Sequence, residues 1–116
     1  MNIYDDANVL AKSLKNCPEV IQLREASKKI SINETNKKML EDFRTIQMEA
    51  YTEQMQKGEV SQTVKEKFEK FGVLMGTNPD LSAYIMAEQR FSVMWEDIMK
   101  ILNDAIDVDL AFKGDK

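Results

Sequence analysis

Histidine is absent from the 116-residue sequence, and cysteine occurs only once, as Cys17. Without histidine the chain lacks the usual general base and the commonest transition-metal ligand, and it can form neither a Ser-His nor a Cys-His nucleophile pair. A single cysteine excludes a disulfide within the chain and leaves no thiolate cluster for zinc or an iron–sulfur centre. These absences argue against an enzyme, and we expect neither a metal nor a cofactor.

Glycine and proline, which interrupt regular structure, are scarce, with four and two residues respectively. The content of 43% hydrophobic and 31% charged residues is that of a folded globular domain. With so few interruptions, a handful of long helices is favoured over a sheet. The sequence contains neither an apolar run of about 18 residues nor a signal peptide, so we expect a cytoplasmic protein that does not enter a membrane.

The net charge of −4 is unevenly distributed: residues 77–116 hold 8 acidic and 4 basic side chains, and residues 1–76 hold 12 of each. Because an acidic surface repels a phosphate backbone, we do not expect direct nucleic-acid binding. Three lysines within residues 65–70 lie close to Phe68 and Phe71, but two glutamates alternate with them. We interpret this segment as an amphipathic helix whose phenylalanines face the core.

The strongest helical pattern covers residues 79–107. Apolar side chains occupy seven of eight positions spaced by three and four residues along one face of this segment. Asn78, Pro79 and Asp80 mark its start as a capping side chain, a first-turn proline and a favourable negative charge. Such a helix would extend roughly 40 Å, whereas a compact domain of this size has a radius of gyration of roughly 13 Å. One chain cannot cover it from end to end, so we expect a homodimer or a higher oligomer.

The remaining helices follow from the same kind of pattern and from capping residues. The predicted segments are short helices within 4–30 that break at Cys17 and Pro18, a long helix over 34–57 between Asn33 and Gly58, a helix over 61–75 starting at Ser61, and a short tail after residue 107. We therefore predict a single all-α domain over residues 1–116. Its four to five helices include two long antiparallel ones and form an elongated, oligomeric helical bundle.

Ten residues on the two long helices form the predicted core or oligomer interface. They are Leu81, Tyr84, Glu88, Phe91, Met94, Trp95, Ile98, Leu102, Phe43 and Ile46. Trp95 lies in the densest part of the apolar face and offers the largest apolar surface there. It is expected at the centre of the main helix contact, either in the core or between chains.

Glu88 is the one carboxylate in this apolar face, and such a residue can be a general acid, a metal ligand or a polar residue that sets helix register. No helical Glu-x-x-His pair accompanies it, so a structural role is favoured, with a partner such as Arg44 or a lysine on another helix. For Cys17 a packing role is favoured over a redox role. Gln47 is interpreted as a satisfied hydrogen bond at a helix contact.

Several polar and small residues recur in a recognisable order along these helices. They are Tyr4, Ala7 and Leu10 at steps of three, then Pro18-Glu19, Phe43-x-x-x-Gln47, Gly58 and Ala87-Glu88-x-Arg90. In this order the chain resembles the YlbF/YmcA family of small helical proteins from Gram-positive bacteria, and it is most similar to the YheA-like branch. The resemblance covers roughly residues 3–107.

The resemblance implies an all-helical fold that associates into dimers or higher oligomers. For some members it also implies a regulatory role, with partner proteins, in competence, biofilm formation and RNA processing. Members of that regulatory complex are associated with iron–sulfur clusters held by cysteines, which a chain with Cys17 alone does not support. Two hypotheses remain: a non-catalytic oligomeric adaptor or regulator acting through helical surfaces, and a small-ligand-binding or RNA-processing accessory module.

Overall fold

The computed structural model describes residues 2–108, which form five α-helices and no strand. The helices are α1 (Ile3–Asn16), α2 (Pro18–Ser31), α3 (Glu34–Lys57), α4 (Gln62–Gly76) and α5 (Pro79–Ile106). The prediction of an all-α protein is confirmed. From residue 109 onward, the predicted tail lies outside the described residues.

Short polar side chains determine where four of the helices begin. Each accepts a hydrogen bond from the backbone N–H three residues later, which satisfies a donor that has no partner within the helix. These caps are Asn2 for α1, Asn33 for α3, Ser61 for α4 and Asn78 for α5. Helix α2 begins instead at Pro18, and α3 ends at Gly58, whose φ of 79° lies in the left-handed region.

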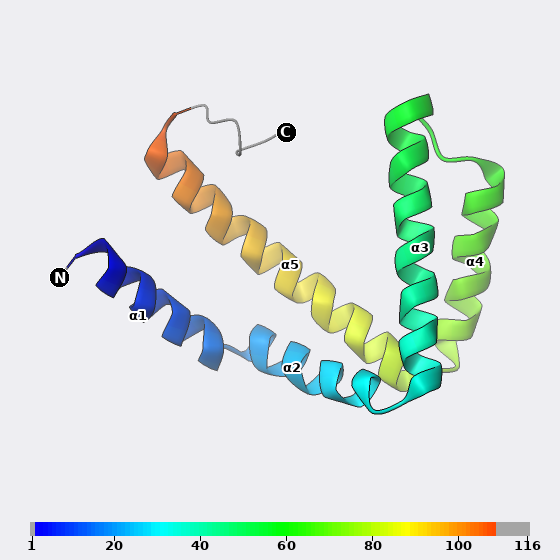
Figure 1. Ribbon diagram of the computed structural model, residues 1–116, viewed down its shortest axis with the longest axis horizontal. Helices are drawn as coiled ribbons and strands as arrows, with labels where there is room; N and C mark the ends of the chain where they lie inside the picture. The colour runs from blue at the N-terminus through cyan, green and yellow to red at the C-terminus, as the bar shows by residue number, and fades with distance from the viewer. Residues whose placement is uncertain (1, 109–116) are drawn as a thin grey trace.

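The helices spread out from one corner (Figure 1). α3 and α4 form an antiparallel hairpin, α2 lies along the first half of α5, and α1 extends beyond α2 toward the N-terminus. The molecule measures 51 × 37 × 17 Å and has a radius of gyration of 17.7 Å. A compact domain of this length would have a radius of gyration of roughly 13 Å, so the predicted elongated shape is confirmed.

The two long helices differ from the predicted arrangement in their relative direction. Asn78 donates to Asn36 at 2.6 Å near the start of both helices, and Arg44 pairs with Glu88 further along both. α3 and α5 therefore run in the same direction from the corner and then diverge (Figure 1). The reason is topological: α4 returns the chain to the base of α3, so α5 starts where α3 starts. Each long helix is antiparallel to a shorter one.

The hydrophobic core lies at this corner, where α2, α3, α4 and α5 meet. Its buried residues are Ile30, Phe71, Leu81 and Ile85, and the partly buried residues packed against them are Met39, Leu40, Phe43, Ile46, Met75 and Tyr84. Phe43 stacks on Phe71 with ring centroids 4.8 Å apart and meets Phe68 edge-on at 6.3 Å. The two α4 phenylalanines thus face the core, as predicted. The core covers only the corner, and the far ends of the helices extend beyond it.

Candidate functional site

The apolar face of α5 divides into a covered half and an open half. Leu81 is 0% exposed, and the last buried residue of the helix is Ala87. Beyond Ala87 no residue of α5 is buried, and Trp95 and Leu102 are each 43% exposed. Within one chain, then, the predicted contact residues Leu81 and Tyr84 join the core, whereas Trp95 and Leu102 do not.

Three residues in the middle of α5 make contacts of their own. Phe91 and Trp95 stack with ring centroids 5.7 Å apart and an interplanar angle of 22°. On a neighbouring side of the helix, the sulfur of Met94 lies 3.9 Å from that of Cys17. This contact places the junction between α1 and α2 against α5, and Ile98, one turn further on, is half-buried. Cys17 thus lies in a packing position.

Arg44 of α3 is the partner that Glu88 was expected to find on another helix. Its guanidinium makes a two-pronged ion pair with the Glu88 carboxylate, with Nη1 2.8 Å from Oε1 and Nη2 bonded to Oε2. The Tyr84 hydroxyl donates to the same carboxylate at 3.2 Å, and Arg44 also donates to Gln47 at 3.2 Å. Glu88 raises the pKa of Arg44, and partial burial, followed by the Glu88 charge, raises the pKa of Tyr84. The cluster is a closed structural network that joins the two long helices.

Exposed apolar side chains continue from this ion pair along both diverging helices. Three side chains on α3 follow Arg44 by 4, 7 and 11 residues, and three on α5 follow Glu88 by 7, 14 and 18 residues. With 3.6 residues per turn, each points within about 40° of the direction in which Arg44 or Glu88 points from its own helix. These side chains therefore face the space between α3 and α5, and one of them, Met48, also borders the groove between α3 and α4. We call them the wedge: Met48, Tyr51 and Met55 on α3, with Trp95, Leu102 and Ile106 on α5. Their exposure ranges from 43% to 69%, so the wedge is an apolar surface that the chain itself does not cover.

Helix α1 is also uncovered along most of its length. It contains no buried residue, and Ile3, Tyr4 and Leu10 are exposed, while Leu14 is half-buried near the junction with α2. A 14-residue helix is only marginally stable in water without tertiary packing. Its capping box, in which the Asn2 side chain and the Asp5 carboxylate each accept from the other residue's backbone N–H, supplies part of the missing stability.

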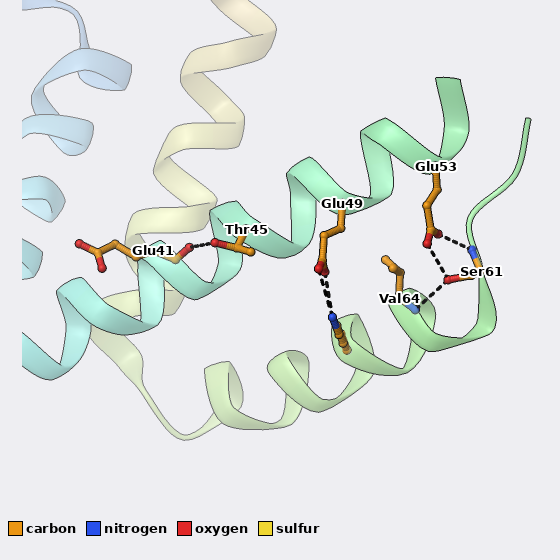
Figure 2. A network of polar contacts seen from close by, with 7 residues as sticks. Glu41, Thr45, Glu49, Glu53, Ser61 and Val64 are labelled. Carbon is orange, nitrogen blue, oxygen red and sulfur yellow. Dashed lines mark hydrogen bonds and ion pairs between the residues drawn. The ribbon is translucent and has the colours of Figure 1, made fainter. Parts of the chain in front are cut away.

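A second surface feature is the open groove between α3 and α4, with a volume of about 530 Å³. Figure 2 shows Glu49 and Glu53 pointing from α3 toward α4. Glu49 pairs with Lys67 at 3.0 Å. Glu53 accepts from the Ser61 N–H at 2.7 Å and from its hydroxyl at 3.0 Å, while Ser61 Oγ accepts from the Val64 N–H. These bonds to Ser61 lower the pKa of Glu53.

The charged groups of this groove are thus already paired with one another, and they join the far ends of α3 and α4. Sequence reasoning found the Ser61 cap but missed Glu53 and Glu49. Their signal is weak, because an exposed glutamate on a helix has many possible partners and only the hairpin geometry selects one.

The described part of the chain contains no group of three or more His, Cys, Asp or Glu side chains placed to hold a metal ion. Among the same residues, no helix is both long enough and apolar enough to cross a membrane.

These features define an elongated all-helical protein that leaves apolar helix faces open. Residues 3–107 match the family described as "Control of competence regulator ComK, YlbF/YmcA", and the chain belongs to this family. The resemblance noted in the sequence is confirmed.

Two relatives match this chain over all or nearly all of their length. A "UPF0342 protein" from Clostridium tetani is 50% identical over 116 residues, which cover 100% of both chains. A "UPF0342 protein" from Halothermothrix orenii is 36% identical over 110 residues, covering 95% of this chain and 93% of the relative. A solved structure described as "Protein of Unknown Function (DUF964) from Bacillus stearothermophilus" matches with a TM-score of 0.71 at 21% identity, covering 90% of this chain and 92% of that one. That likeness shows a shared fold.

Proposed function

We propose that this protein is a non-catalytic, oligomeric adaptor or regulator that acts through helical protein–protein surfaces. One observation carries the proposal: the second half of α5 keeps the apolar pattern of a core helix, yet none of its residues is buried within the chain. Exposed apolar patches of this kind mark interaction sites in soluble proteins. The family description, which refers to control of a regulator, is consistent with a role of this type.

Self-association is the part of this proposal that can be tested directly. The protein is expected to form a dimer or a higher oligomer at tens of micromolar, as measured by size-exclusion chromatography with light scattering. Its melting temperature should rise with protein concentration, because association stabilises the folded state by mass action. A monomer at these concentrations, with a melting temperature independent of concentration, would remove the self-association proposal.

The groove between α3 and α4 favours one alternative, a small-ligand-binding module. Its volume of about 530 Å³ lies within the range of roughly 300–1,000 Å³ that is typical of ligand sites. Its carboxylates, however, are paired with Lys67 and Ser61, and the groove is open rather than enclosing. Native mass spectrometry distinguishes the two: a small molecule retained stoichiometrically by the purified protein supports the binding module, and mass accounted for by protein alone supports the adaptor.

A further inference from the structure

We propose that the second half of α5 from another copy of this chain packs into the space between α3 and α5 that the wedge residues line. The two copies do this reciprocally, in a two-fold symmetric arrangement that we call the clasp. The inference rests on the proposed self-association and names the surface that it uses. Each copy contributes both the wedge and the helix that enters it. Such a contact is isologous and closes on itself as a dimer.

Exposed apolar side chains lie on two sides of α5. A helix that enters a wedge touches two walls, so it needs apolar side chains on two sides. α5 has them: Trp95, Leu102 and Ile106 lie on the wedge side, and Val93 and Ile101 lie on roughly the opposite side and are 62% and 66% exposed. In the clasp, the wedge sides of the two α5 helices pack against each other. Val93 and Ile101 then contact the α3 wall of the other copy, which consists of the three wedge residues on α3, Met48, Tyr51 and Met55.

The exposed apolar surface is large enough for such a contact. The wedge together with Val93 and Ile101 exposes roughly 600 Å² of apolar side chain per copy, taking 150–250 Å² for a whole aromatic side chain and about 100 Å² for an aliphatic one. A standard interface buries about 800 Å² per partner, of which about 60% is apolar. The available apolar surface is therefore enough for a stable dimer.

The charges near the two surfaces also favour this contact. The side of α5 around Ile101 carries Asp97 and Asp104, and Asp104 pairs with Lys100 at 2.8 Å. The α3 wall is flanked by Gln47 and Gln54 on one side and, toward the α3/α4 groove, by Thr45 and Thr52, and all four side chains are uncharged. An acidic helix can therefore approach this wall without facing like charges. The open α3/α4 groove is a poorer surface for the apolar side chains of α5, because charged residues of both signs, Glu49, Glu53, Lys57 and Lys67, line it.

The experiment uses the full chain and two variants that place a charge in the proposed contact. Tyr51→Lys changes the α3 wall, and Ile101→Lys changes the entering side of α5. Both positions are well exposed in the single chain, so the helix content measured by circular dichroism should not change. Gln56→Lys, on the groove side of α3, and Leu10→Lys, on α1, are the matched controls.

Each of the two wedge variants should weaken dimerisation by at least about 30-fold, the effect of losing a central interface side chain. Light scattering should then report the mass of one chain at concentrations where both controls remain dimeric. Trp95, the single tryptophan, lies on the α5 wall, so its emission should shift to the red and its quenching by iodide should increase when the dimer dissociates.

The outcomes separate this inference from the proposed function. If the wild-type protein is monomeric, both are wrong. If it is dimeric and remains so in Tyr51→Lys and Ile101→Lys, the clasp is wrong and self-association stands. Dissociation by Leu10→Lys, with Tyr51→Lys still dimeric, likewise overturns the clasp and assigns the contact to α1.

Discussion

The ion pair between Arg44 and Glu88 joins the two long helices where they begin to diverge, and we expect it to stabilise the fold more than the other ion pairs. The test is a double-mutant cycle with Arg44→Met, Glu88→Gln and the double variant. Glu88→Gln removes the carboxylate charge and keeps the size of the side chain. Arg44→Met removes the guanidinium and keeps most of the apolar stem.

The size of the effect follows from the partial burial of the pair. The Arg44 and Glu88 side chains are 40% and 28% exposed, between the fully exposed and fully buried cases. Exposed pairs contribute about 0–1 kcal/mol, and breaking a buried pair costs about 3–5 kcal/mol. The paired geometry and the Tyr84 hydroxyl add strength, while access to water reduces it. We expect a coupling energy of about 1–2 kcal/mol.

Urea unfolding followed by circular dichroism measures this coupling for the four proteins at one fixed protein concentration. The Lys38 and Asp42 pair, four residues apart on an exposed face of α3, is the matched control and should show a smaller coupling. Salt at 1 M should reduce the control coupling more than that of Arg44 and Glu88. A coupling between Arg44 and Glu88 no larger than the control would refute the reasoning that partial burial strengthens the pair.

Three further predictions concern other parts of the fold. Leu81→Ala should destabilise the protein by about 2–5 kcal/mol in urea unfolding because the residue is fully buried in a small core; a loss below about 1 kcal/mol would contradict its place in the core. Because bonds to Ser61 lower the pKa of Glu53, their stabilisation is present above the ordinary pKa of a glutamate and is lost as the pH falls through the lowered value. The wild type should therefore melt at a higher temperature than Glu53→Gln at neutral pH, and this gap should close in acid; a gap that does not depend on pH would rule this out. Gly58→Ala should destabilise by about 1–2 kcal/mol because its φ of 79° strains any other residue, whereas Gly72→Ala, in open space within α4, should stabilise by about 0.5–1 kcal/mol; changes of the same sign in thermal unfolding would show that this reading of the backbone is wrong.

Local signals in the sequence were sufficient to predict the helices. The start of α5 follows from Asn78, whose side chain accepts from the Leu81 N–H, and the end of α3 follows from Gly58. Both depend on residues within one helical turn, and such interactions form regardless of how the helices pack. The sequence also predicted that Glu88 has a partner on another helix, because a carboxylate within an apolar face requires one.

The tertiary structure alone decided how the apolar faces are used. Periodicity identifies the inner face of α5 but does not distinguish burial within the chain from burial against another chain, since both need the same apolar spacing. That distinction depends on where α4 ends. Helix α4 ends at the base of α3, so α3 and α5 diverge from there and only the first half of α5 contacts the core. The choice of Arg44 as the partner of Glu88, and of Ser61 as the partner of Glu53, follows in the same way from helix packing, which brings together side chains 44 and 8 residues apart.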